Sequence, residues 1–248
     1  MQKNNYSLVK RIINDSKYLV VFTGAGISVE SGIPPFTGNG GLWTKYDPKF
    51  IELSYFYSHP LDSWKEIKKI FYDYMLNKSK PNLAHLTIGK WEKEGLVKAI
   101  ITQNIDNLHQ AGGGKNVIEF HGTTKTLICT KCNHIYYDNE IALKELPPKC
   151  TKCGGILKPN FVFYGEGINQ ETYHNAIQTI NHADVILIIG TSGQVMPANQ
   201  LPFSQKYSNP NTIIIEVNPT KSSFTDTITD YYFDTTAVNF FKKLELIK

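Results

Sequence analysis

The stretch of sequence that decides the fold is Tyr18-Leu-Val-Val-Phe-Thr-Gly-Ala-Gly26, an apolar run that ends in a glycine-rich turn. Residues 97–101, 185–189 and 212–216 repeat this pattern, because each run is mostly aliphatic and is followed by a small or polar turn. Runs with little polar alternation are typical of strands that are buried on both faces of a parallel sheet. We therefore expect four parallel strands whose carboxyl ends carry the turns.

Helix-like stretches at residues 60–74, 83–94 and 171–182 lie between these runs. This alternation predicts an α/β fold with a Rossmann-like, doubly wound parallel sheet, in which ligands bind beyond the carboxyl ends of the strands. Residues 125–157 interrupt the alternation and are predicted to form an inserted small domain. Residues 45–75, rich in aromatic residues and helix formers, are expected to join that small domain or to form a flexible lid. The expected discontinuous sheet domain therefore comprises residues 1–44, 76–124 and 158–248.

All four cysteines fall into two C-x-x-C pairs, Cys129 with Cys132 and Cys150 with Cys153, separated by 17 residues. Without a secretory signal, such pairs favour metal binding over disulfides. Zinc takes four thiolates in a tetrahedron at about 2.3 Å, and each C-x-x-C turn supplies two of them. We predict one structural zinc ion in a zinc ribbon, with no open position for chemistry. Two reduced or disulfide-bonded pairs, or a ribbon that contacts nucleic acid, are the alternatives.

Composition limits the partners. The apolar fraction of 41% and the charged fraction of 19% are those of a globular protein, and the net charge of +4 comes from scattered lysines. We therefore expect no nucleic-acid partner. The first apolar run has four residues and follows a charged stretch, unlike a signal peptide or a membrane span. We expect a cytoplasmic protein, without a membrane partner, that acts as a monomer.

The glycine-rich turn Gly24-Ala25-Gly26 follows a predicted buried strand, which is where a phosphate-binding loop belongs. The third glycine of a dehydrogenase fingerprint would fall at Val29, and no obvious acidic residue for ribose follows about 20 positions on. The turn therefore favours a nucleotide ligand, but not an ordinary hydride-transfer enzyme.

Longer motifs identify a family. The run from Gly24 to Gly38, Gly-Ala-Gly-Ile-Ser-Val-Glu-Ser-Gly-Ile-Pro-Pro-Phe-Thr-Gly, followed by Gly-Leu-Trp43, resembles the first signature of the sirtuins. Further matches follow in the family's order, and together they cover roughly residues 18–243. They are Pro81-Asn82-x-Ala84-His85, Thr102-Gln-Asn-Ile-Asp106, Leu108-His109, His121-Gly122, the two C-x-x-C pairs, Lys158-Pro-Asn-Phe-Val-Phe-Tyr-Gly-Glu166, Gly190-Thr-Ser192 and Glu216-Val-Asn218.

The resemblance implies NAD as co-substrate, bound between the sheet domain and the zinc-bearing domain. It places the pyrophosphate at Gly24, Ala25, Gly26 and Ser28. The other implied cofactor contacts are Phe36 over the nicotinamide pocket, Gln103 and Asn104 at the nicotinamide ribose, Ile105 and Asp106 at the carboxamide, and Gly190, Thr191, Ser192 and Asn218 at the adenosine half. These residue types suit the contacts, since amides and a carboxylate pair with ribose hydroxyls and an amide NH2.

His121 is the predicted general base. In the implied mechanism the acyl oxygen of a substrate lysine attacks the anomeric carbon, nicotinamide leaves, and the base activates a ribose hydroxyl. A neutral imidazole, with an ordinary pKa near 6.5, can take that proton at cellular pH. We expect His85 and His109 to be structural. Residues 161–164 are expected to form an edge that an acyl-lysine peptide joins as an added strand, and the expected substrate contacts are Val162, Phe163, Tyr164 and Gly165.

The chain departs from the family pattern at a few positions. Thr37 stands where the family has an arginine, Gly193 where an apolar residue is usual, and Asp234 where a glycine is common. Losing a hydrogen bond to a charged group costs roughly 1.5–3 kcal/mol, so we expect weaker or altered NAD handling and predict that Thr37→Arg raises turnover on an acetyl-lysine peptide. Ile67 and Ile70 replace the Tyr and Arg of family members that prefer succinyl or malonyl groups. We therefore expect a neutral acyl group, unless Lys68 or Lys69 reaches the acyl chain.

The sequence thus predicts an NAD-dependent protein-lysine deacetylase or deacylase that releases nicotinamide and O-acyl-ADP-ribose. Two alternatives are an ADP-ribosyltransferase or NAD hydrolase of the same family, and an NAD-binding sensor with little turnover. The presence of His121 favours deacylation, because the proton transfer it performs is needed only there.

Overall fold

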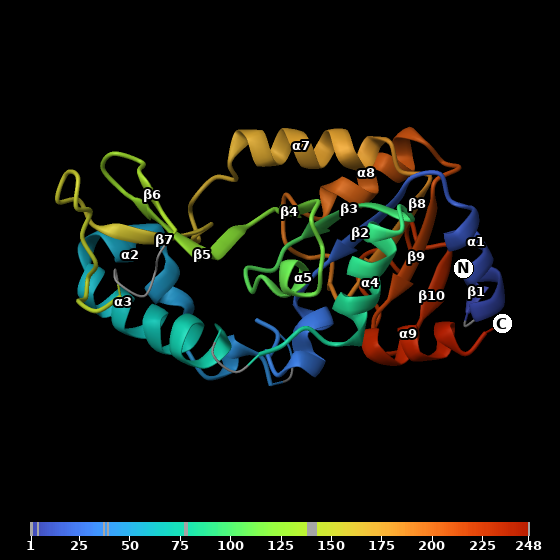
Figure 1. The fold of residues 1–248 in the computed structure, drawn as a ribbon, viewed down its shortest axis with the longest axis horizontal. Coiled ribbons are helices and arrows are strands. Elements are labelled where there is room, and N and C mark those ends of the chain that lie inside the picture. Colours follow the sequence, from blue (N-terminus) through green and yellow to red (C-terminus); the bar gives the residue numbers. More distant parts are fainter. Residues whose placement is uncertain are drawn as a thin grey trace.

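Seven parallel strands form the larger of two sheets in the computed structural model, which describes residues 2, 3, 5–36, 38, 40–76, 79–137 and 143–247 (Figure 1). The strand order is β1-β10-β9-β8-β2-β3-β4, so the chain winds outward in both directions from the centre of the sheet. The bounds are β1 Gln2–Lys3, β2 Leu19–Thr23, β3 Val97–Thr102, β4 Val117–Glu119, β8 Val185–Ile189, β9 Ile213–Val217 and β10 Tyr231–Phe233.

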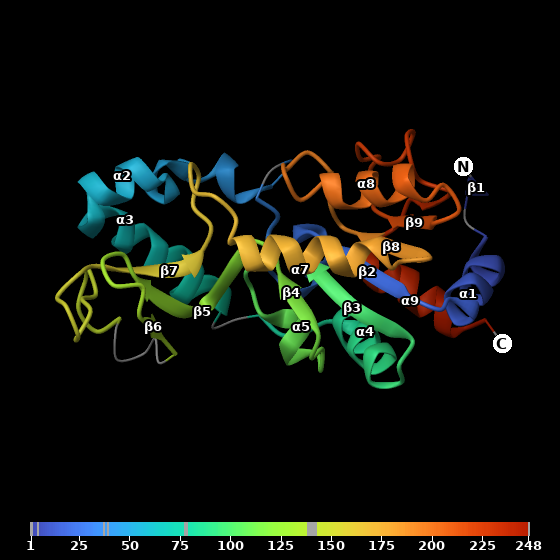
Figure 2. The same cartoon turned by 90° about the horizontal axis from the view of Figure 1, so that it is seen from above.

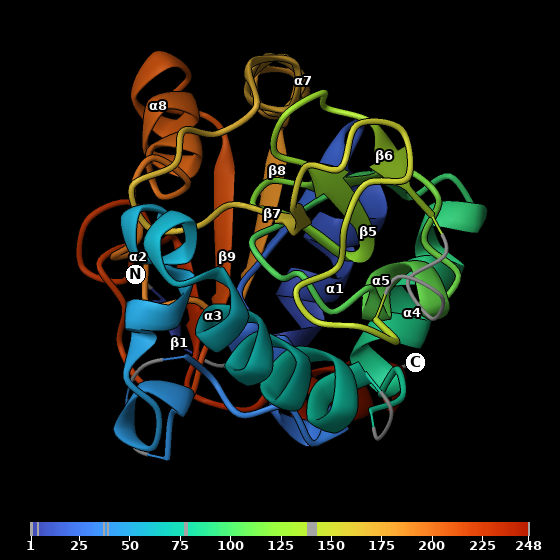
Figure 3. The same cartoon turned by 90° about the vertical axis from the view of Figure 1, so that its left-hand side faces the viewer.

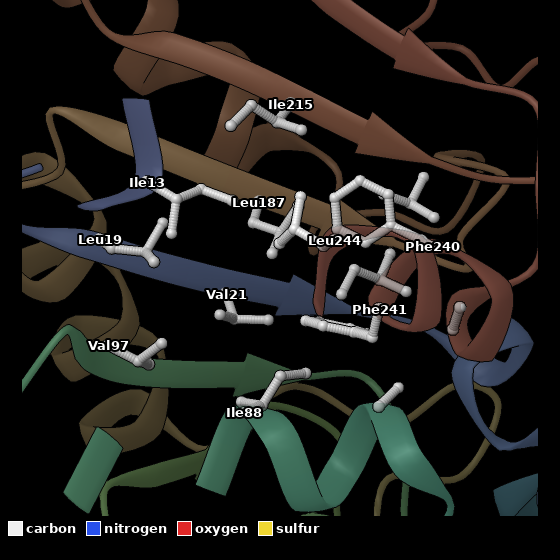
Figure 4. Packing of buried hydrophobic residues seen from close by; sticks show 14 of the residues in the cluster. Ile13, Leu19, Val21, Ile88, Val97, Leu187, Ile215, Phe240, Phe241 and Leu244 are labelled. Carbon is white, nitrogen blue, oxygen red and sulfur yellow. The ribbon is translucent and has the colours of Figure 1, made fainter. Parts of the chain in front are cut away.

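Helices cover both faces of this sheet, which explains the absence of polar alternation in its strands (Figures 1 and 2). On one face, Leu19 and Val21 of β2 pack in a core with residues from three helices, and Figure 4 shows part of it. On the other face, Val20 and Phe22 pack in a second core under two helices. The helices in the core around Leu19 and Val21 are α1 Tyr6–Asp15, α4 Leu83–Lys93 and α9 Ala237–Glu245. Those over Val20 and Phe22 are α7 Gln170–Asn181 and α8 Gln200–Ser208.

A second, antiparallel sheet of three strands lies to one side of the first (Figure 1), with its strands in the order β6-β5-β7 (Figure 3). Its strands are β5 Gly122–Cys129, β6 Ile135–Tyr136 and β7 Leu157–Phe161. Helices α2 Leu53–Ser58 and α3 Pro60–Ile67 share an apolar core with this sheet, and Trp64 Nε1 donates a hydrogen bond of 2.8 Å to the Leu157 carbonyl. Of the two expectations for residues 45–75, packing with the cysteine-bearing segment is the arrangement observed.

The predicted strands lie within one residue of the observed ones, but the helix predicted at residues 60–74 changes type part-way. After α3 the chain continues as a π-helix, Lys68–Leu76. Lys68 Nζ lies 2.8 Å from Asp73 Oδ1, and this five-residue spacing matches the i to i+5 repeat of that helix. The short strands β1, β4 and β10 and the helices α1, α8 and α9 were not predicted.

Short elements complete the chain between the larger ones. They are α5 Leu108–Ala111 and the 3-10 helices Ala25–Ser31, Leu42–Thr44 and Pro48–Ile51. Among the described residues, no helix has both the length and the apolar character needed to cross a membrane.

Candidate active site

A cavity of about 1300 Å³ opens at the carboxyl ends of β2, β3, β8 and β9 and extends to the segment that follows β7. This is the place where doubly wound sheets bind ligands. Its lining includes nearly all residues predicted to contact cofactor or substrate: Gly24, Ala25, Gly26, Phe36, Gln103, Asn104, Ile105, His121, Val162, Phe163, Tyr164, Gly165, Gly190, Thr191, Ser192 and Asn218. Ser28 and Asp106, the two exceptions, lie behind the wall.

The glycine-rich turn packs backbone against backbone with the turn after β8. Gly26 N–H donates to the Gly190 carbonyl at 2.8 Å, and a Cβ on Gly26 would lie 2.6 Å from Gly190 Cα. A Cβ on Gly190 would in turn lie 2.4 Å from the Ile27 nitrogen. Both positions therefore require glycine, and Gly26 lies at the start of the 3-10 helix Ala25–Ser31.

A buried polar group supports this wall from behind. Ser28 Oγ donates to Asp106 Oδ2 at 2.6 Å, and Leu108 N–H donates to Asp106 Oδ1 at 2.9 Å. Asn104 Nδ2 donates to the Gly24 carbonyl at 3.2 Å. Burial raises the pKa of Asp106, and the hydrogen bonds from Ser28 and Leu108 oppose that shift. The polar residues after β3 are thus tied to the glycine-rich turn after β2.

Thr191 joins three strand ends through hydrogen bonds. Its Oγ1 accepts from Gln103 Nε2 at 3.1 Å, and its carbonyl accepts from Asn218 Nδ2 at 3.3 Å. Gln103 follows β3, Thr191 follows β8 and Asn218 follows β9. The amide side chains are therefore held at one edge of the sheet, where they line the cavity.

His121 lies where the two sides of the cavity meet, directly before β5. Its Nδ1 is 3.1 Å from the Gln103 carbonyl oxygen, which can only accept a hydrogen bond. Nδ1 therefore carries the proton in the neutral ring, and Nε2 keeps a free electron pair. Burial lowers the pKa of His121, and the bond to Gln103 opposes that shift in part. The ring is therefore neutral near pH 7 and is able to take a proton.

The segment after β7 corrects the prediction of an edge strand. The strand ends at Phe161, because the next backbone groups bond elsewhere: Val162 N–H donates to the His121 carbonyl at 2.8 Å, and Tyr164 N–H donates to the Ile51 carbonyl at 2.9 Å. Tyr164 forms an isolated parallel bridge with Glu52. For the Val162 carbonyl, no partner is found among the described residues. The segment thus presents individual backbone groups rather than a continuous edge.

The four cysteines converge at the far end of the small sheet. Their Sγ atoms all lie within 4.8 Å of one another, with 3.4 Å between Cys129 and Cys153 and 3.7 Å between Cys132 and Cys150. Thiolates around one zinc ion would be about 3.8 Å apart. Tyr136 Oη donates to Cys150 Sγ at 3.1 Å, a contact that orients one ligand. The cluster is thus placed to bind one metal ion, consistent with a structural zinc that has no open position.

The sequence of this chain matches a known protein family. A family model described as "Sir2 family" matches residues 24–197. An NAD-dependent protein deacetylase of Caldivirga maquilingensis is 42% identical over 214 residues, which are 84% of this chain and 81% of the relative. An NAD-dependent protein deacylase of Pyrococcus abyssi is 40% identical over 233 residues, which are 90% of each chain.

The chain belongs to the Sir2 family.

Solved structures of Sir2 proteins share the whole fold. A Sir2 homolog in complex with NAD superimposes with a TM-score of 0.88 at 36% identity, covering 98% of this chain and 93% of that one. Sir2Tm bound to a propionylated peptide gives a TM-score of 0.86 at 33% identity, covering 97% of each chain. The sirtuin resemblance seen in the sequence is therefore confirmed at the level of family and fold.

The departures from the Sir2 pattern have different structural settings. Gly193 has φ +69°, and a Cβ there would lie 2.2 Å from Ser223 Oγ and 2.8 Å from the Phe224 ring, so this chain needs glycine where the family usually has an apolar residue. Asp234 is exposed and does not line the cavity. Thr37 lies outside the described residues, so its predicted effect stays a prediction.

The positions that could select an acyl group are apolar. Ile67 and Ile70 are buried in the core of the small sheet, and the cavity wall beside them is formed by Ile51 and Phe71. Lys68 pairs with Asp73, and Lys69 lies 3.6 Å from Glu66. Neither lysine lines the cavity.

Several lining residues were not predicted. They include Trp43, whose Nε1 donates to Tyr164 Oη at 3.1 Å and whose ring lies 5.4 Å from that of Phe36. Val195 and Met196, 51% and 68% exposed, also lie at the cavity. A pair of apolar residues in the turn that begins after Ser192, separated from it by Gly193 and Gln194, was the available signal, because surface turns are usually polar.

Proposed function

We propose that this Sir2 protein is an NAD-dependent protein-lysine deacylase that releases nicotinamide and O-acyl-ADP-ribose. The observation that carries the proposal is the place of His121, whose ring is bonded to Gln103 on the cofactor side and whose carbonyl accepts from Val162 on the peptide side. A single base thus contacts both halves of one cavity. The relatives named above as NAD-dependent deacetylases and deacylases support the same activity.

The cofactor would lie along the strand ends. Gly24 N–H and Gly26 N–H already donate to backbone carbonyls, so Ala25 N–H is the donor that the turn leaves for a pyrophosphate among the described residues. Amide side chains suit ribose hydroxyls and the carboxamide. We assign the pyrophosphate to Gly24, Ala25, Gly26 and Ser28, the nicotinamide half to Phe36, Gln103, Asn104, Ile105 and Asp106, and the adenosine half to Gly190, Thr191, Ser192 and Asn218. Ser28 and Asp106 would act from behind the wall, by orienting the residues that line it.

The residues of the chain would act on the reaction in a definite order. NAD, when bound, supplies the anomeric carbon that receives the acyl oxygen as nicotinamide leaves. His121 Nε2 would then take a proton from a ribose hydroxyl, while Nδ1 stays bonded to Gln103 and keeps the ring oriented. Phe36 and Trp43, in aromatic contact at 5.4 Å, would exclude water from the reacting centre.

The peptide would lie along Val162, Phe163, Tyr164 and Gly165. An acyl-lysine amide has one N–H, and the Val162 carbonyl is an acceptor at the cavity wall without a partner among the described residues. That pairing would place the acyl oxygen on the cofactor side, near His121. Ile51 and Phe71 would surround the acyl group, so we propose a neutral acyl chain as substrate.

The zinc-bearing cysteines would hold the small domain as a wall of this cavity and take no part in the chemistry. The proposed small domain comprises residues 45–75 and 125–157, and the remainder of the chain is the proposed NAD-binding domain. Action as a monomer, the absence of a nucleic-acid partner and a cytoplasmic location stay predictions.

The test is to follow nicotinamide release from NAD with and without an acetyl-lysine peptide and to identify the ADP-ribose product by mass. Release that requires the peptide, with O-acetyl-ADP-ribose as product, is the expected result. Release without peptide would contradict the proposal and support ADP-ribosyl transfer or NAD hydrolysis. NAD binding without release would identify a sensor.

A further inference from the structure

A buried ammonium group lies beneath the proposed peptide segment. Lys158, in β7, is 5% exposed, and its Nζ donates to the carbonyls of Pro159 at 3.0 Å and Phe161 at 2.6 Å. The third acceptor is Glu166 Oε2 at 3.0 Å. An ammonium has three N–H donors, so each of them has a partner within nine residues of the same chain.

Glu166 connects this group to the backbone of the segment. Its Oε2 also accepts from Phe163 N–H at 2.9 Å, and its own N–H donates to the Phe163 carbonyl at 3.0 Å. The Phe163 ring lies over Lys158, with 4.2 Å between Nζ and the ring centroid. Residues 158–166 therefore fold around one positive charge.

Beyond the end of β7, contacts to the Lys158 ammonium hold the segment where the regular pairing of the sheet no longer does. Regular pairing in the small sheet ends at Phe161, and Val162 to Gly165 lie beyond it. The acceptors of Lys158 lie on both sides of Val162, at Phe161 and at Glu166. The position of the Val162 carbonyl, for which the described part of the chain offers no partner, is thus set by contacts to a side chain outside the cavity lining.

We propose that Lys158 is a positioning residue for substrate binding, which holds the peptide segment in place through Phe161, Glu166 and the ring of Phe163. The proposal rests on the proposed function, because it assigns the affinity for the acyl-lysine peptide to this group. It predicts that loss of Lys158 weakens peptide binding but not NAD binding, since the contacts found for Lys158 among the described residues all lie within residues 158–166.

The chain contains a matched control in Lys206. Its Nζ donates to the Thr212 carbonyl at 2.7 Å and to Asp230 Oδ2 at 2.8 Å, and Asp230 Oδ2 accepts from Ile214 N–H at 2.8 Å. The arrangement resembles that at Lys158, since the lysine bonds to a carboxylate that also accepts from a backbone N–H, but Lys206 has one carbonyl acceptor where Lys158 has two. None of these residues lines the cavity.

The experiment compares Lys158→Met, Lys158→Arg and Lys206→Met in steady-state deacylation of an acetyl-lysine peptide. We expect Lys158→Met to raise the peptide KM at least roughly tenfold, because it leaves the partly buried Glu166 carboxylate without its cation and the Pro159 and Phe161 carbonyls without their donor. The KM for NAD should change less than about twofold, since uniform loss of peptide binding leaves the other substrate unaffected. Lys158→Arg should restore most of the peptide affinity, and Lys206→Met should leave both KM values unchanged.

Hydrogen exchange gives a second readout that needs no activity. In Lys158→Met the Phe163 amide should exchange faster by at least about tenfold, while Ile214 is unchanged, and Lys206→Met should give the reverse. If the wild-type protein shows no deacylation but Lys158→Met still speeds exchange of the Phe163 amide, the proposed function is wrong and Lys158 nevertheless supports the segment. If Lys158→Met does not fold, Glu166→Gln, which keeps an acceptor for Phe163 N–H but removes the charge, is tested in the same way.

The proposal is overturned if folded Lys158→Met or Glu166→Gln keeps the wild-type peptide KM and Phe163 exchange. It is also overturned if Lys206→Met raises the peptide KM as much as Lys158→Met does, since the effect would then be one of general stability.

Discussion

The two sides of the cavity are built by different means. On the cofactor side, the wall consists of turns at the ends of β2, β3, β8 and β9, and each turn begins where a buried parallel strand ends. On the peptide side, the wall is a segment beyond the end of β7 that is held by single contacts to His121, Ile51 and Glu166. The sheet therefore determines the conformation of the cofactor side, whereas separate hydrogen bonds determine that of the peptide side.

This difference decides how each side responds to change. The strands under the cofactor side have both faces buried in apolar cores, so the turns that form this wall lose their structure only when the sheet itself unfolds. The peptide side depends on the small sheet and on the cysteine cluster at its far end. A change in a single element of the small domain should therefore weaken peptide binding more than NAD binding.

Removal of the metal is the strongest test of this contrast. Chelation should abolish deacylation, because a structural zinc site contributes about 10–16 kcal/mol to the folding of its module. Amides of β5 and β7 should lose protection from hydrogen exchange, while those of β2 and β8 keep it. Added Zn²⁺ should restore both activity and protection. Full activity in a sample shown by metal analysis to be free of zinc would contradict a supporting role.

Replacement of His121 tests the point where the two sides meet. His121→Ala removes the imidazole but keeps the carbonyl that accepts from Val162, so both walls should remain in place. Deacylation should fall by about 10²–10⁴-fold, the usual contribution of a general base. NAD affinity, measured by calorimetry, should change little, and His182→Ala at an exposed position serves as the control.

The same residue predicts the pH dependence of the wild type. Because burial lowers the pKa of His121 in the free protein, its ring is mostly neutral at pH 6.5, and the acid limb of kcat/KM should lie below that value. An acid limb clearly above pH 6.5 would show that His121 is not the group that titrates.

The contrast also explains how much could be predicted from the sequence. The cofactor side was predictable because a run such as residues 185–189 shows its burial in its composition, and the turn that follows it is then placed by the sheet. The cysteine cluster was predictable because its spacing follows from the coordination of the metal. The residues of the peptide side were predicted, but its conformation was not, because the pairing of Tyr164 with Glu52 and the contact between Trp43 and Tyr164 join segments more than 100 residues apart. Nothing local in residues 161–165 indicates that their N–H groups bond to side chains and loops rather than to a strand.

Acid should weaken the cofactor side through its buried histidines. His85 is fully buried, and burial lowers its pKa to about 4. Between pH 6.5 and 4 the unfolded chain binds a proton at this histidine and the folded chain does not, so the free energy of unfolding falls as the pH falls through this range. The total loss from His85 is about 3 kcal/mol, from the difference between the two pKa values.

The measurement is urea denaturation of the wild type and His85→Gln at pH 7.5, 5.5 and 4.5. The wild type should lose more stability over this range than the variant does, and the difference isolates His85 from other groups. His109, whose ring lies 5.0 Å from that of His85 and whose pKa is also lowered by burial, acts in the same direction in both proteins. Equal slopes for the two proteins would show that the burial of His85 does not affect acid stability.

The smallest expected effect lies within the cofactor side itself, at Gly193. Gly193→Ala places a methyl group at φ +69° and against Ser223 Oγ, whereas Gly95→Ala, at φ +80° with open space around it, adds only the backbone strain. The strain costs about 1–2 kcal/mol in each variant. Gly193→Ala should lose more stability than Gly95→Ala and raise the KM for NAD several-fold, because Gly193 N–H also donates to Thr191 Oγ1 at 3.2 Å. Its peptide KM should stay at the wild-type value. A rise in the peptide KM equal to the rise for NAD would show that the two sides are coupled through the sheet, and the distinction between them would then be wrong.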